Sequence, residues 1–405
     1  MSRKTMTTQK TYNFCFYDQR FFELSKEAGE VYSRSLEEFW KIYDETGVWL
    51  SKFDLQKHMR NKLERKLLHS DSFLGAMQQV HANLASWKQA KKVVPDACPP
   101  RKPKFLQAIL FKKSQIKYKN GFLRLTLGTE KEFLYLKWDI NIPLPIYGSV
   151  TYSKTRGWKI NLCLETEVEQ KNLSENKYLS IDLGVKRVAT IFDGENTITL
   201  SGKKFMGLMH YRNKLNGKTQ SRLSHKKKGS NNYKKIQRAK RKTTDRLLNI
   251  QKEMLHKYSS FIVNYAIRND IGNIIIGDNS STHDSPNMRG KTNQKISQNP
   301  EQKLKNYIKY KFESISGRVD IVPEPYTSRK CPHCKNIKKS SPKGRTYKCK
   351  KCGFIFDRDG VGAINIYNEN VSFGQIISPG RIRSLTEPIG MKFHNEIYFK
   401  SYVAA

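Results

Sequence analysis

The chain has 405 residues, and its 75 Lys and Arg residues against 36 Asp and Glu residues give a formal net charge of +39. A hydrophobic fraction of 37%, with 20 Phe and 20 Tyr, is enough for two or three packed cores and excludes a disordered basic tail. The charge excess is far larger than solubility requires, so we expect a polyanionic partner.

The sequence also bears on the compartment of the protein. No stretch approaches the roughly 20 apolar residues of a transmembrane helix, and the polar start MSRKTMTTQK lacks the core of a signal peptide. We therefore expect a cytoplasmic protein with no membrane partner. Four of the 7 cysteines fall in one late cluster while the others are scattered, a pattern that favours metal binding over disulfides.

The first part of the chain combines helical and strand patterns. Apolar residues recur at helical spacing over 19–92, and the proline-rich stretch VVPDACPPRKPK at 93–104 ends this region. From about 105 to 170 the period is two, clearest in WKINLCLE, where Trp158 and Ile160 share one face. We predict a β-barrel or sandwich, completed by a first strand near 11–17, with the helices inserted as a bundle.

The pattern changes again at residue 178. YLSIDLGVKRVATIFDGENTITL contains three candidate strands, and a long helical region follows. NIIIGD and VDIVPE are then apolar strands on either side of a helical segment. This order predicts a mixed α/β sheet and matches an RNase H-like nuclease core.

A basic segment lies within this second part. Between Lys203 and Arg246 there are 16 Lys or Arg residues and one acid, Asp245. A solvated helix face is the ordinary alternative, but such self-repulsion favours a nucleic-acid partner that neutralises it. The expected contacts, mainly to phosphates, are Lys226, Lys227, Lys228, Lys234, Lys235, Arg238, Lys240, Arg241 and Lys242.

The cysteine cluster predicts a zinc site. Cys331, Cys334, Cys349 and Cys352 form two CxxC pairs separated by 14 residues. Each pair brings two thiolates together from one tight turn, and two pairs complete a tetrahedral site. Four thiolates leave no open coordination position, so we expect one structural zinc ion, with His333 pointing outward.

Three carboxylates are candidates for metal-dependent phosphodiester cleavage, which needs acids that converge on two magnesium ions. Asp182 in SIDLG ends the first strand, although the same turn can cap a strand or hold phosphate. Asp359 in DRDGVGAINI precedes a short helix, where its alternative role is a helix N-cap.

The second carboxylate is not where an RNase H-like sheet would place it. NIIIGD ends in Gly277, and Asp278 is one residue out of phase, so it points to the opposite face. Glu324 ends the next strand between Pro323 and Pro325, which restrict the backbone on both sides. Our hypothesis is that Glu324 reaches into the space left by Gly277. An exposed glutamate in a proline turn remains the alternative.

At these residues the chain resembles TnpB, a transposon-encoded family of RNA-guided nucleases related to type V CRISPR effectors and Fanzor proteins. The motifs that carry the resemblance are SIDLGVKRVAT, IIIGDNSST, EPYTSRKCPHC, SPKGRTYKCKKCGF and DRDGVGAINI. They cover residues 178–366, and the earlier residues match in layout only. The resemblance implies a RuvC-type three-acid site at Asp182, Glu324 and Asp359, since a subset of the family pairs a GD ending with a glutamate before YT. Val361 and Gly362 depart from the commoner Asn and Ala of the last motif.

The resemblance also implies a multidomain α+β and α/β organisation. The expected parts are a wedge-like β-barrel at 1–18 and 104–172, a helical recognition lobe at 19–103, a RuvC-like domain at 173–328 and 354–370, a zinc ribbon at 329–353 and a C-terminal tail at 371–405. The implied function is cleavage of double-stranded DNA that matches a bound guide RNA, by a monomer. A nuclease-inactive guided repressor and a guide-independent transposase are the alternatives.

Overall fold

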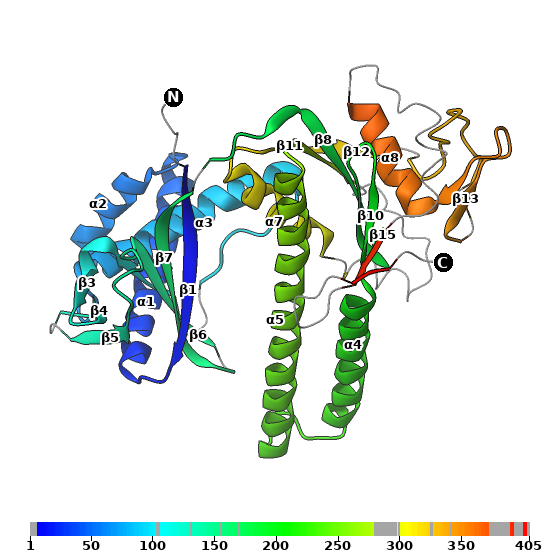
Figure 1. Cartoon of the computed structure of the whole chain (residues 1–405). Helices are drawn as coiled ribbons and strands as arrows, with labels where there is room; N and C mark the ends of the chain where they lie inside the picture. The colour runs from blue at the N-terminus through cyan, green and yellow to red at the C-terminus, as the bar shows by residue number, and fades with distance from the viewer. Residues whose placement is uncertain are drawn as a thin grey trace. The chain divides into compact units, whose positions relative to one another are not determined.

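The computed structural model describes residues 6–402, except 103–105, 130–131, 154, 169, 279–297, 299, 325–326, 341, 343, 372–388 and 393–399. The chain divides into two compact units, one of residues 7–167 and one that contains residues 168–405 (Figure 1). This boundary lies five residues before the predicted start of the nuclease domain. Among the described helices, none is long and apolar enough to cross a membrane.

The unit of residues 7–167 contains the predicted helices: α1 (Arg20–Thr46), α2 (Lys52–Lys62) and α3 (Ser70–Val93). In α1, the apolar residues at helical spacing form the core, as predicted: Leu24, Val31 and Phe39 are buried. Glu27 is a buried carboxylate that accepts backbone N–H bonds from residues 66–68 at 2.7–3.0 Å and so fixes the α2–α3 connection.

The strands of this unit pair in two sheets. The first sheet has the order β1-β7-β6-β2, with β1 (Met6–Phe16), β7 (Gly157–Val168), β6 (Tyr147–Ser153) and β2 (Ile109–Lys112). The first strand of the chain thus joins this sheet, as predicted, and Trp158 and Ile160 of β7 are buried. The second sheet is β3 (Ile116–Lys119), β4 (Phe122–Thr126) and β5 (Phe133–Lys137), and a 3-10 turn at Lys113–Gln115 precedes it.

The unit of residues 168–405 is built on a mixed seven-stranded sheet of order β12-β11-β8-β9-β10-β15-β16. Its strands are β8 (Ser174–Leu183), β9 (Arg187–Phe192), β10 (Thr197–Ser201), β11 (Ile271–Asp278), β12 (Arg318–Pro323), β15 (Ile389–Lys392) and β16 (Lys400–Tyr402). β11 is parallel to both β8 and β12, so the carboxyl ends of these three strands meet at one edge. Residues 389–392 and 400–402, which the sequence analysis placed in a tail, extend the sheet.

Helices cover the sheet. α5 (Asn231–Arg268) and α7 (Glu301–Glu313) pack against β11 and β12, and α8 (Arg358–Asn370) packs against β8 and β9. Figure 1 shows α4 (Lys203–Ser224) and α5 as a long hairpin that projects from the sheet. The cysteine-rich segment lies before α8 and contains the hairpin of β13 (Thr346–Lys348) and β14 (Ile355–Asp357).

Candidate nuclease site

The structure places the Glu324 side chain in the space beside Gly277. β11 and β12 are parallel, and Gly277 lies opposite Val322. Glu324 is two residues beyond Val322, so its side chain leaves the same face as Gly277. A Cβ added to Gly277 would lie 1.4 Å from the Glu324 Oε1 and 2.4 Å from its Cγ. The carboxyl group of Glu324 therefore occupies the position that a side chain at residue 277 would take.

The half-buried Asp182 lies at the end of β8 in the same region. Its carboxyl group packs on α8, because a Cβ added to Gly362 would be 2.2 Å from the Asp182 Oδ2. Desolvation by burial, and then the negative charges of Glu324 and Asp359, hold the pKa of the Asp182 carboxyl well above its usual range. The absence of a side chain at Gly362 thus makes room for Asp182, and nearby carboxylates make ionisation of this group costly.

Asp359, in the first turn of α8, is surrounded by arginines. Its carboxylate lies 3.0 Å from the Arg358 Nη2, 3.6 Å from the Arg187 Nη1 and 3.7 Å from the Arg345 Nη1. The N-cap of α8 is Asp357, whose Oδ1 accepts backbone N–H bonds from residues 359 and 360. The alternative role of Asp359 as an N-cap is therefore wrong, since capping by Asp357 leaves the Asp359 carboxylate available to cations.

A buried ion-pair group lies at the same edge of the sheet. The Lys305 ammonium lies 2.7 Å from the Asp278 Oδ1 and 3.1 Å from the Glu301 Oε1, and only 3% of the Lys305 side chain is exposed. Asp278 points to the face opposite Gly277, as its position one residue later in the strand predicted, and forms an ion pair there with Lys305 of α7. The charge of Glu301 also raises the pKa of Asp182. A fourth carboxylate, that of Glu301, therefore lies within electrostatic range of Asp182.

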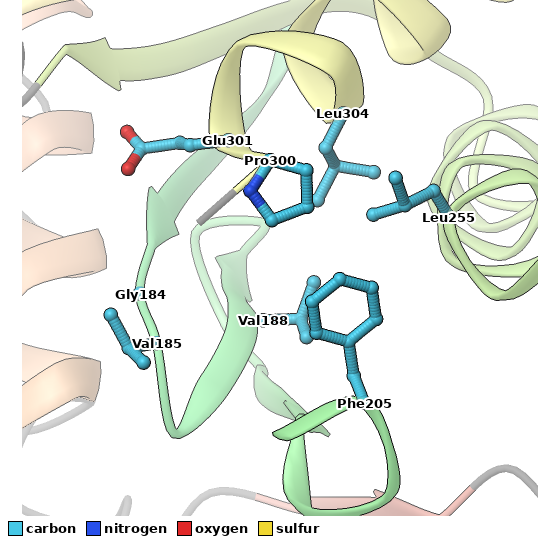
Figure 2. Close-up of a pocket in the computed structure, with 8 residues that line it drawn as sticks. All are labelled: Gly184, Val185, Val188, Phe205, Leu255, Pro300, Glu301 and Leu304. Carbon is cyan, nitrogen blue, oxygen red and sulfur yellow. The ribbon is translucent and has the colours of Figure 1, made fainter. Parts of the chain in front are cut away.

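A small, mostly apolar cavity lies beside Gly184. Figure 2 shows its apolar lining, with the Glu301 carboxyl group pointing away from Leu304 and Leu255. The cavity holds only about 10 Å³, the space of one water molecule. A polymer such as nucleic acid cannot enter this cavity.

The four cysteines fit a zinc ion. Among the described residues, they are the group of potential ligands whose donor atoms all lie within 4.8 Å of one another. The Cys331 and Cys352 Sγ atoms are 3.7 Å apart, and those of Cys334 and Cys349 are 3.5 Å apart. A tetrahedral zinc ion with bonds of about 2.3 Å requires sulfur separations of about 3.8 Å.

α8 also anchors the segment that joins Glu324 to the cysteines. The buried Asn365 amide donates to the carbonyl oxygens of Thr327 at 2.6 Å and Lys330 at 2.8 Å. One helix therefore carries Asp359, packs on Asp182 through Gly362, and fixes the chain that follows Glu324.

The basic residues predicted to contact nucleic acid lie on the α4–α5 hairpin or on the turn that joins its helices. Eight of the nine are exposed, and Lys240 is half-buried with its Nζ 3.5 Å from the Gln220 Oε1. Within the described part of the chain, none of the nine forms an ion pair with an acidic side chain. Their charge is therefore available to a partner.

Comparison with known proteins finds two family models that match parts of the chain. Residues 161–282 match a family model described as "Probable transposase" (OrfB_IS605), and residues 302–366 match the TNB domain of Cas12f1-like proteins. These parts of the chain are similar to TnpB-like and Cas12f1-like proteins. A "TnpB-like protein" of Methanocaldococcus jannaschii is 28% identical over 210 residues, which are 50% of this chain and 72% of the relative.

Two further relatives are named as nucleases. The InsQ protein of Escherichia coli K12, whose name describes an RNA-guided DNA endonuclease, is 28% identical over 58% of this chain and 60% of its own length. The CRISPR-associated endodeoxyribonuclease Cas12f1 of Sulfoacidibacillus thermotolerans is 26% identical over 53% of this chain and 50% of its own length. The matches to these two relatives thus span less than two thirds of their length.

A solved structure shares the fold. The Cas12f1 chain of a complex with single-guide RNA and target DNA matches 86% of this chain with a TM-score of 0.59 and 15% identity, and 82% of that chain is covered. The chain therefore has a mixed α/β multidomain fold similar to that of Cas12 effectors.

Sequence reasoning missed the cations at the site. Arg187 and Arg345 are far from Asp359 in sequence, and Lys305 lies within an ordinary amphipathic helical pattern. The available signal was that Arg187 and Arg345 fall inside motifs of the family resemblance, whereas Lys305 lies outside them.

Proposed function

We propose that this chain is an RNA-guided, magnesium-dependent DNA endonuclease. The observation that carries the proposal is the Glu324 carboxyl group, which fills the side-chain space of Gly277. Without it, the chain would lack the second acid of a three-acid site and would be expected to bind guided DNA without cutting. The names of the relatives InsQ and Cas12f1 support the same activity.

In this proposal, the sheet of β8–β12 is an RNase H-like (RuvC) core, because its strand order places the first strand between the second and the fourth. The two sheets of residues 7–167 are the wedge-like barrel, their helices are the recognition lobe, and the cysteine segment is a zinc ribbon. Base pairing between guide and target supplies sequence specificity, while the α4–α5 hairpin contacts phosphates. We expect a cytoplasmic monomer.

The three acids suit hard divalent cations, which prefer carboxylate oxygens. Asp182, Glu324 and Asp359 would hold two magnesium ions, which stabilise the attacking and leaving oxygens of the phosphodiester. The pKa of Asp182 is raised because burial and neighbouring negative charges disfavour its ionised form. A bound cation would offset these charges and favour the ionised carboxylate. Arg187 and Arg345 offset the charge of Asp359 and lie where a phosphate would approach.

The test is to express the chain with its native 3′ flanking sequence, sequence the RNA that co-purifies, and digest a plasmid library that matches this RNA. We expect RNA of defined length and guide-dependent cuts that need magnesium and stop with EDTA. Guided binding without cuts would refute the nuclease and favour a repressor. DNA strand transfer without RNA would refute guidance altogether.

A further inference from the structure

The three-stranded sheet of β3, β4 and β5 has one polar, aromatic face. Side chains alternate between its two faces, and Leu123 and Leu125 are fully buried on the inner one. β3 and β4 join through Asn120 and Gly121, which both have positive φ (50° and 81°), the geometry of a tight two-residue hairpin. This turn fixes the register and therefore determines which side chains share the outer face.

The strand pairing arranges the outer face in rows. Arg124 is paired with Lys117 on one side and with Tyr135 on the other. In the next row, Phe122 is paired with Lys119 and Lys137. Each row therefore has an aromatic ring next to cationic side chains, at the spacing of about 4.8 Å between neighbouring strands.

The rings of this face are accessible. Phe122 is 43% exposed and Tyr135 is 53% exposed. The Arg124 guanidinium lies over the ring of Phe133, 4.5 Å from its centroid. The Arg124 Nε is buried and has no hydrogen-bond partner among the described residues, a costly state that an acceptor at this face would relieve.

The charge of the face has one sign. The three strands contain no Asp or Glu, and across the described residues none of the four cations on the face forms an ion pair. Glu132, just before β5, instead lies 3.5 Å from the Arg20 Nη1. Lysines on a small sheet can simply prevent aggregation, but that role does not explain two exposed rings between them.

We propose that this outer face binds an unpaired segment of RNA, with bases stacked on Phe122 and Tyr135 and phosphates held by the surrounding cations. Stacking needs a free base face, which a duplex does not offer. The inference rests on the proposed function, which supplies an RNA partner, and assigns part of that RNA to the unit of residues 7–167.

The test uses the full-length protein with Phe122→Ala and Tyr135→Ala combined. Fluorescence anisotropy compares the binding of oligouridine with that of a DNA duplex. Each stacked base contributes about 1–3 kcal/mol, so we expect the loss of two stacking rings to raise the Kd for oligouridine at least ~30-fold while the duplex Kd is unchanged. The matched control is Phe53→Ala, because Phe53 on α2 is also an exposed ring (73%) next to a cation, Lys52.

Ultraviolet cross-linking of the co-purified complex adds a second readout, with cross-links expected at Phe122 or Tyr135. Unchanged oligouridine binding, or cross-links elsewhere only, would overturn the inference. A loss confined to single-stranded DNA would overturn the choice of RNA. These readouts do not need cleavage, so guided cutting with normal oligouridine binding in the variant refutes this inference alone. Weakened oligouridine binding by the variant, together with no cutting by the unmodified protein, refutes only the nuclease.

Discussion

Gly277→Ala should stop the proposed DNA cleavage without unfolding the protein. The added Cβ would lie 1.4 Å from the Glu324 Oε1. The carboxyl group must move by about 2 Å to restore ordinary van der Waals contact. A misplacement of about 1 Å in a catalytic group can cost about 100-fold in rate, so we expect guided cleavage to slow by ~100-fold or more.

The same substitution should change stability little. Alanine in a strand interior is favoured over glycine by about 0.5–1 kcal/mol. The displaced Glu324 side chain is flexible, and leaving its preferred rotamer costs about 0.5–1.5 kcal/mol. The two contributions nearly cancel, so the unfolding midpoint in urea should stay close to that of the unmodified protein.

Single-turnover cleavage of a guide-matched plasmid measures the effect. The matched control is Gly207→Ala in α4, where an added Cβ meets no atom within 4 Å. A swap tests the geometry further, because Glu324→Ala empties the space that Gly277→Glu would then fill from the neighbouring strand. The double variant should cut faster than Glu324→Ala alone. Cleavage by Gly277→Ala at the unmodified rate would refute the reasoning.

Three further results are expected. Gly362→Ala puts a Cβ 2.2 Å from the Asp182 Oδ2, so plasmid cleavage should slow while guide binding persists, and equal cleavage would contradict the packing. Lys305→Met leaves the carboxylates of Asp278 and Glu301 without their buried cation. Urea titration should then show that the free energy of unfolding falls by about 3–5 kcal/mol. A loss below about 1 kcal/mol would show that these ion pairs are exposed to solvent. Cys349→Ser should remove the zinc detected by atomic absorption, whereas Cys98→Ser, outside the cluster, should retain it.

The sequence predicted what local patterns determine. Alternation located the buried face of β7, and the CxxC spacing located the four thiols that the fold brings together. The relation between Glu324 and Gly277 was also within reach, because it depends on the phase of two adjacent parallel strands.

Contacts between distant residues could not be predicted in this way. The arginines around Asp359 come from β9, from the residue before β13 and from α8, and only the tertiary fold brings them together. β15 and β16 are strands of four and three residues, which are too short to show a detectable alternation. β15 forms by pairing with β10, and β16 forms by pairing with β15. Local pattern thus located the three candidate acids, and packing supplied the cations around Asp359.

The most direct test of the account is guided cleavage by Asp182→Asn, Glu324→Gln and Asp359→Asn, measured beside target binding by the same complexes. Each variant keeps the size of the side chain and removes the charge proposed to hold a metal ion. We expect all three to bind guide and target normally and to cut at least about 100-fold more slowly. Cleavage by Glu324→Gln at the unmodified rate, with Asp182→Asn inactive, would contradict the assignment of Glu324 as the second acid.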